Sequence, residues 1–404
     1  MIIKNGGVCS PKGFKAAGAA TGIKAGSSKK DMALIVSDVM CNAAAVYTQN
    51  KVFGAPITVT RQNIADGKAQ AIICNSGNAN TCAPGGVELA EKVCEMTGEA
   101  LNLQATDIVV ASTGVIGQKL EIEPFEKGIP LLAGMISAHK GNEAAEAIMT
   151  TDTVPKSIAV EFEANGVKCT VGAIAKGSGM INPNMATMLS FITTDAGITS
   201  EMLRKALSKD IKTSYNQICV DGDTSTNDMV VLMANGMAGN PVIDGEGEAF
   251  DSFCKALNQV TVHIAKCLAR DGEGATKLIE CNVSGAPDDE TARVISKSVI
   301  TSDLLKVAIF GADANWGRVL CAIGYAQGDF ATDNIDVSMS SNVGSVLVCL
   351  GSRHNPYSEE EASRILSEEE ITINVNMNQG EGGATAWGCD LTYDYVKING
   401  DYRS

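Results

Sequence analysis

The stretch Gly177-Ser-Gly-Met-Ile-Asn-Pro-Asn-Met-Ala-Thr-Met-Leu-Ser-Phe-Ile-Thr-Thr194 contains no charged residue, although 20% of the 404-residue chain is charged. Its first half is rich in glycine, asparagine and proline, which are typical of turns, whereas its second half has the Met, Leu, Phe, Ile and Thr composition of a strand. We therefore predict a loop that becomes a buried strand at Thr187. A purely structural role is the simplest interpretation of this threonine, because such hydroxyls often only hydrogen-bond to nearby backbone.

The same position also permits catalysis. Cleavage of the peptide bond between Ala186 and Thr187 would leave a free threonine amine beside its own hydroxyl, which combines a base and a nucleophile in one residue. This amine has an unperturbed pKa of roughly 7.7–8.0, and a charge-free environment favours its neutral, basic form. Acyl transfer also needs donors for an oxyanion, and Thr113-Gly114, at the end of a predicted strand, offers a hydroxyl and a backbone N–H, although this pair alone is a common turn.

Composition limits the class of protein. The apolar content of 45% allows one large or two medium domains, and the 41 glycines with only 4% aromatic residues predict closely packed layers of sheet and helix. The net charge of −15 argues against a nucleic-acid partner. Thirteen cysteines without a C-x-x-C pair indicate reduced thiols, and no apolar run reaches the roughly 18 residues of a membrane span. We expect a cytoplasmic protein with neither nucleic-acid nor membrane partners.

Hydrophobic periodicity predicts a mixture of helices and strands. The first part of the chain should contain strands over 33–36, 71–74 and 107–111, a helix over 87–101, and a hairpin whose strands, 158–164 and 167–175, are joined by Asn165-Gly166. The second part should contain helices starting at Ser200 and over 249–268, a short helix capped by Ser358 with Glu361, and strands over 371–377 and 391–398.

Familiar catalytic motifs are missing from the sequence. The three histidines do not form H-E-x-x-H, and there is neither a Walker loop, nor G-x-G-x-x-G after a strand, nor G-x-S-x-G. A zinc site, a nucleotide site and a Ser-His-Asp hydrolase therefore have no sequence support. A nucleophile that works without histidine needs another base, which returns attention to Thr187.

Several further motifs follow one another along the chain. They are KGF (12–14) with AAG (16–18), NSGNAN (75–80), STGVIG (112–117), MTTDT (149–153), KGSGMI and PNMATML within 176–189, DGEGATK (271–277), GAD and NWGR within 311–318, and Y-x-Y-V-x-I-N (393–399). In this order, and over essentially the whole chain, they resemble the ornithine acetyltransferases of arginine biosynthesis, also called glutamate N-acetyltransferases.

The resemblance implies self-cleavage between Ala186 and Thr187 into chains 1–186 and 187–404, a cut that is not a domain boundary. It implies an α/β fold, a layered αββα-type sandwich formed jointly by both chains, paired as an α2β2 assembly. Thr187 would take the acetyl group of N-acetylornithine and pass it to glutamate, with no bound cofactor or metal; acetyl-CoA is a possible second donor that the motifs do not decide.

By the same resemblance, individual residues receive roles. Thr113 and Gly114 match the oxyanion-hole pair, and the substrate-binding positions are Thr153, Lys176, Thr187, Glu273, Asn399 and Ser404. Lys176 and Glu273 suit the carboxylate and ammonium groups of an amino acid. The segments 75–80 and 313–318 are candidates for a supporting role behind the site.

Two alternatives remain open from sequence. An N-terminal-nucleophile amidase or aminopeptidase would use water instead of glutamate as the acyl acceptor. A binding protein with a degenerate site would be expected to lack Thr187 or Lys176, and this chain has both.

Overall fold

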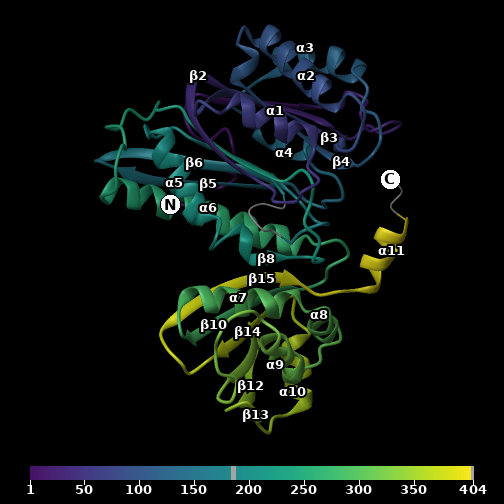
Figure 1. The fold of residues 1–404 in the computed structure, drawn as a ribbon, viewed down its shortest axis with the longest axis vertical. Helices are drawn as coiled ribbons and strands as arrows, with labels where there is room; N and C mark the ends of the chain where they lie inside the picture. Colours follow the sequence, from purple (N-terminus) through teal and green to yellow (C-terminus); the bar gives the residue numbers. More distant parts are fainter. Residues whose placement is uncertain (183–187, 402–404) are drawn as a thin grey trace.

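The computed structural model describes residues 1–182 and 188–401 and contains two β-sheets with helices packed on both (Figure 1). The first sheet has the strand order β4-β3-β2-β9-β7-β6-β5, with β1 on β2. Its strands are β1 (Phe14–Ala19), β2 (Met32–Tyr47), β3 (Lys68–Asn78), β4 (Ile108–Val115), β5 (Lys156–Ala164), β6 (Val167–Lys176), β7 (Leu189–Thr194) and β9 (Met229–Ala234). Its helices are α1 (Ala55–Asn63), α2 (Gly86–Leu101), α3 (Glu123–Met135), α4 (Gly141–Ala147), α5 (Ser200–Asp210) and α6 (Glu248–Arg270).

Strand β2 divides this sheet into two halves that face each other. Its pairing with β3 shifts register between Val36 and Cys41, and its second half pairs with β9. Side chains then alternate between two cores, as strand geometry requires: Ile35 points into a core shared with Phe191 and Val231 of the other half.

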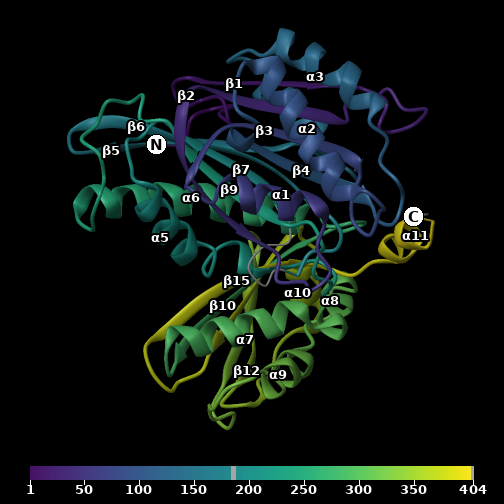
Figure 2. The same cartoon turned by 45° about the horizontal axis from the view of Figure 1, so that its top comes forward.

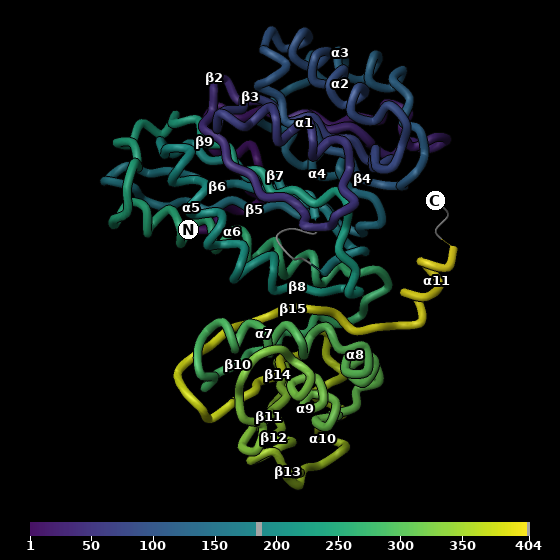
Figure 3. Tube along the Cα trace, in the orientation of Figure 1, coloured from purple at the N-terminus to yellow at the C-terminus, as the bar shows by residue number. Residues whose placement is uncertain are grey.

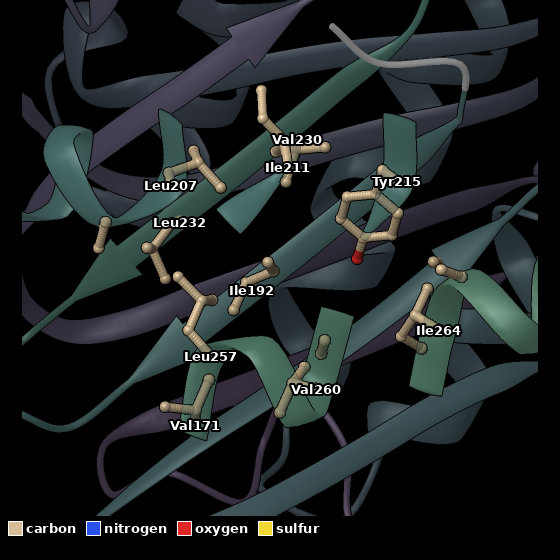
Figure 4. Packing of buried hydrophobic residues seen from close by; sticks show 14 of the residues in the cluster. Val171, Ile192, Leu207, Ile211, Tyr215, Val230, Leu232, Leu257, Val260 and Ile264 are labelled. Atoms are coloured by element: carbon tan, nitrogen blue, oxygen red, sulfur yellow. The ribbon is translucent and has the colours of Figure 1, made fainter. Parts of the chain in front are cut away.

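Each half also has an outer face covered by helices. On the β1–β4 half, residues of α2 and α3 complete a core with Leu34. On the other half, α5 and α6 pack against the strands, as Figure 4 shows for Leu207, Leu257 and Val260 around Ile192. The order of layers is helix, sheet, sheet, helix, so the αββα sandwich expected from the resemblance is confirmed.

A second body lies beyond α6, as the turned view in Figure 2 also shows. Its sheet has the order β13-β12-β11-β14-β10-β15-β8, with helices on one side and a hydrophobic core of its own. Its strands are β8 (Ile218–Cys219), β10 (Leu278–Ala286), β11 (Asp336–Ser341), β12 (Gly344–Leu350), β13 (Arg353–His354), β14 (Glu370–Asn376) and β15 (Gly382–Cys389). Its helices are α7 (Asp289–Thr301), α8 (Asp303–Phe310), α9 (Trp316–Gly324) and α10 (Glu359–Leu366).

Most of the predicted elements are present, and the predicted capping of α10 is confirmed because the Ser358 hydroxyl accepts the Glu361 N–H. The predicted strand over 391–398 is wrong. This segment forms helix α11 (Tyr393–Asp401), which lies to one side of the second sheet (Figure 3). Asp390 accepts the N–H groups of Thr276 and Lys277, which ends the strand, and the Thr392 hydroxyl accepts the Tyr395 N–H at the start of the helix.

Within the described residues, no helix is both long enough and apolar enough to span a membrane.

Candidate active site

A polar cavity of about 150 Å³ collects most of the predicted site residues. It is lined by Ala79, Thr113, Gly114, Ile116, Thr150, Thr151, Lys176, Gly179, Met180, Ser225, Thr226, Asn227, Glu273 and Asn399. Five residues that the sequence analysis selected are therefore brought together. Ala186, Thr187 and Ser404 lie outside the described residues. Strand β7 begins at Leu189, two residues after Thr187 in the sequence, and Leu189 pairs with Lys176.

The cavity forms where strands from both halves of the sandwich end. Thr113 is near the end of β4 and Lys176 is the last residue of β6. Although 63 residues separate them, the Lys176 ammonium group donates to the Thr113 hydroxyl over 3.4 Å. The side chain of Lys176 is only 10% exposed, so its charge faces the protein and the cavity.

Gly114 is required by its backbone geometry. Its φ angle is +131°, in the region that favours glycine, and a Cβ atom there would lie 2.3 Å from the carbonyl carbon of Gly77. This close approach coincides with a register shift between β3 and β4. Any side chain at position 114 would push apart the two strand ends that form this wall.

A buried ionic network stands behind the cavity. Lys156, whose side chain is 1% exposed, donates to Asp152 over 2.7 Å and to Asp271 over 2.6 Å. Asp152 also accepts the N–H groups of Gly177 and Thr150, and its Oδ2 lies 3.9 Å from the Lys176 ammonium nitrogen. The network fixes the backbone on both sides of the cavity floor.

The charge of Asp152 depends on this network. Burial alone would raise the pKa of its carboxyl group, but the ammonium groups of Lys176 and Lys156, together with hydrogen bonds, hold that pKa well below its ordinary value. Asp152 is therefore an anion at neutral pH.

Thr153 is placed differently from the other predicted residues. Its N–H and its hydroxyl both donate to Asp271, and it lines a neighbouring cavity of about 800 Å³ together with residues of α11. Thr153 therefore reaches the smaller cavity only through the ionic network. Its assignment to substrate binding stays a prediction.

Glu273 and Asn399 form the opposite wall. The Asn399 amide donates to Oε2 of Glu273 over 2.8 Å, and the Glu273 N–H donates to the Ser178 carbonyl oxygen. A Cβ atom on Gly179 would lie 2.4 Å from the Glu273 carboxylate, so a glycine at this position is what allows the acid to enter the cavity.

Sequence reasoning missed the polar segment 225–227, which precedes β9. Asn227 is buried, and its amide donates to the carbonyl oxygens of Ala79 and Ser112 over 2.6 and 2.9 Å. It thereby joins the end of β3 to β4. The run Thr224-Ser-Thr-Asn227 before an apolar strand was the available signal.

Asp228, the next residue, carries an unusual carboxyl group. It is 3% exposed, and its Oδ2 has no hydrogen-bond partner among the described residues. Burial raises the pKa of Asp228 well above its ordinary value, against the smaller opposing effects of Ser225 and Lys176.

The two supporting segments from the sequence analysis have different outcomes. In 75–80, the Asn75 side chain accepts the Ser112 hydroxyl over 2.6 Å, directly behind the β4 wall. The segment 313–318 does not line the cavity. Its Asn315 side chain accepts the Arg318 N–H and caps α9 in the second body.

The fold and the cavity define a layered α/β sandwich protein with a charged site at the strand ends, where glycines allow close contacts between the walls. Comparison with known proteins places the chain within this class: the ArgJ family matches residues 15–404. This chain therefore belongs to the ArgJ family.

Individual relatives are similar over their full length. "Arginine biosynthesis bifunctional protein ArgJ 1" of Clostridium acetobutylicum is 50% identical over 404 residues, which is 100% of this chain and 99% of that protein. The bifunctional ArgJ protein of Caldanaerobacter subterraneus is 48% identical and matches 100% of both chains. The crystal structure of an ArgJ protein from Bacillus halodurans is 49% identical with a TM-score of 0.51, and covers 54% of this chain and 100% of that one.

The ionic network predicts a large stability loss for Lys156→Met. This change would leave Asp152 and Asp271 buried without their shared cation, and breaking a buried pair in this way costs about 3–5 kcal/mol. We expect urea unfolding to show this loss when Lys156→Met is compared with the chain that keeps Lys156. Both chains carry Thr187→Ala, so that the self-cleavage expected from the resemblance does not complicate the comparison.

The matched control is Lys168→Met. Lys168 pairs with Glu161 at the surface, with a side chain that is 70% exposed, so its removal should cost less than about 1 kcal/mol. Equal stabilities for the two variants would contradict a central role for Lys156.

Proposed function

We propose that this protein transfers the acetyl group of N-acetylornithine to glutamate in arginine biosynthesis, through an acetyl ester on Thr187. The single observation that carries the proposal is that Thr113, Gly114, Lys176 and Glu273 line one cavity. Lys176 pairs with Leu189, the first residue of β7, and Thr187 lies two residues before Leu189 in the sequence. The names of the full-length relatives, which place them in arginine biosynthesis, support the pathway.

The active form is proposed to arise by self-cleavage. The Thr187 hydroxyl attacks the carbonyl carbon of Ala186, the C–N bond breaks, and the acyl group moves from nitrogen to oxygen. Water then hydrolyses this ester, which leaves a carboxylate on Ala186 and a free amine and hydroxyl on Thr187. The Bacillus halodurans structure supports the scheme. The whole of that chain matches only 54% of this one, and residues 187–404, the C-terminal product of the proposed cleavage, also make up 54% of the sequence.

Acetyl transfer is proposed to follow two steps. The Thr187 amine accepts the hydroxyl proton as the oxygen attacks the acetyl carbonyl of N-acetylornithine, and ornithine leaves with that proton. The Thr113 hydroxyl and the Gly114 N–H stabilise the oxyanion. The amine of glutamate then attacks the acetyl ester and regenerates the Thr187 hydroxyl.

Charge supports amino-acid substrates. Among the residues that line the cavity, Lys176 is the cation and Glu273 is the carboxylate, which match the α-carboxylate and the side-chain ammonium group of N-acetylornithine. Asn399 holds Glu273 in its position from α11. Thr153 acts through Asp271, and Ser404 is assigned to substrate binding by resemblance alone.

Two further features belong to this proposal. Acetyl-CoA serves as a second acetyl donor to glutamate, in keeping with the word "bifunctional" in the relatives' names. The cleaved chains assemble as α2β2.

Thr187→Ala is predicted to abolish cleavage, because no hydroxyl remains to attack the preceding carbonyl group. On a denaturing gel, wild-type protein should give two bands and the variant one full-length band. Two bands from Thr187→Ala, or one from the wild type, would contradict the scheme.

Product analysis is predicted to separate transfer from hydrolysis. Wild-type protein with N-acetylornithine and glutamate should form N-acetylglutamate, and omission of glutamate should suppress ornithine release. Equal release of free acetate with and without glutamate would favour the amidase alternative. Replacing the donor with acetyl-CoA tests the second activity, with Thr187→Ala as the blank in both assays.

A further inference from the structure

The chain just before residue 183 is held by a dense set of hydrogen bonds from the segment 220–224. The Asp221 carboxylate accepts the N–H groups of Met180 and Ile181 over 2.6 and 2.9 Å. Three more bonds join the same two segments: Val220 N–H to the Ile181 carbonyl oxygen, the Asn182 amide to the Gly222 carbonyl oxygen, and the Thr224 hydroxyl to the Asn182 carbonyl oxygen.

Asp221 is the charged member of this set. A carboxylate that accepts two successive N–H groups makes stronger bonds than a neutral acceptor does. Met180 has a φ angle of +55°, which residues other than glycine rarely adopt, and it is 42% exposed. Burial therefore contributes little to fixing Met180, and the Asp221 bond defines its backbone conformation.

The same part of the chain also contacts the residues that follow 187. The Met229 N–H donates to the Met188 carbonyl oxygen over 2.9 Å. Asp221 also lies near Tyr395 of α11, because burial and, to a smaller extent, the Asp221 carboxylate raise the pKa of that hydroxyl. Residues 220–229 thus bind the backbone on both sides of the proposed cleavage position.

We propose that Asp221 is a positioning residue for self-cleavage, which fixes residues 180–182 on the N-terminal side of the Ala186–Thr187 peptide bond. This inference rests on the proposed function, since it concerns the cleavage step of that scheme. Asp221 has no role as acid, base or nucleophile, and the acetyl-transfer step depends on it less than cleavage does.

The test compares Asp221→Asn with Asp223→Asn. An asparagine of the same shape presents only one acceptor oxygen to the two N–H groups, whereas Asp223 is exposed and makes no bond to 180–182. Cleavage of pulse-labelled chains in cell-free translation should slow about tenfold or more in Asp221→Asn and change less than about twofold in Asp223→Asn. Transfer per cleaved chain should stay within about threefold of wild type for both.

A second variant covers the case in which Asp221→Asn does not fold. Thr224→Val removes the bond to the Asn182 carbonyl oxygen with little change of shape, and should slow cleavage about threefold or more. If Asp221→Asn folds and cleaves at the wild-type rate, the proposal is overturned. If Asp221→Asn does not fold, a wild-type cleavage rate in Thr224→Val overturns it. So would a transfer rate per cleaved chain that falls as far as the cleavage rate. Failure of the wild type to cleave would instead overturn the proposed function.

Discussion

The bridge from Lys156 to two buried carboxylates is the interaction on which the site depends. Asp152 orients the backbone at Thr150 and Gly177 and faces Lys176, while Asp271 holds Thr153 and begins the loop that carries Glu273. Because these charges are removed from water, each must stay paired, and their pairing fixes the distance between the two walls of the cavity.

The αββα sandwich explains why residues so distant in sequence meet. The bend in β2 folds the first sheet onto itself, so the ends of β4 and β6 approach from opposite halves. Glycines 114 and 179 then allow contacts that any side chain would block. The segment 220–229 joins the chain on either side of residues 183–187, which connects the cavity to the proposed cleavage position.

Local signals predicted local structure well. The Asn165-Gly166 turn, the periodicity of α2 and the Ser358 cap each depend on neighbouring residues, and each is present. The prediction for 391–398 was wrong because the alternation of its residues resembles that of a strand. In the structure, the Asp390 side chain accepts the N–H groups of residues 276 and 277, and the chain turns away from the sheet there. That contact spans more than a hundred residues and leaves no local pattern.

The same distinction applies to the site. Thr113, Gly114, Lys176, Glu273 and Asn399 were selected through motifs of a family, and their meeting in one cavity follows from the topology. Lys156, Asn227 and Asp221 were not selected, because each has a partner far away in the sequence. Asp271 is 115 residues from Lys156, Ala79 is 148 residues from Asn227, and Met180 is 41 residues from Asp221. Only the folded chain reveals which polar residues these three hold in place.

The most direct measurement is the mass of the C-terminal chain after rapid quenching of the wild-type enzyme with N-acetylornithine alone. We predict one added acetyl group, located on the peptide that begins with Thr187 and lost when glutamate is supplied before the quench. An unmodified chain under conditions where acetyl transfer proceeds, or an acetyl group on any other residue, would contradict the account.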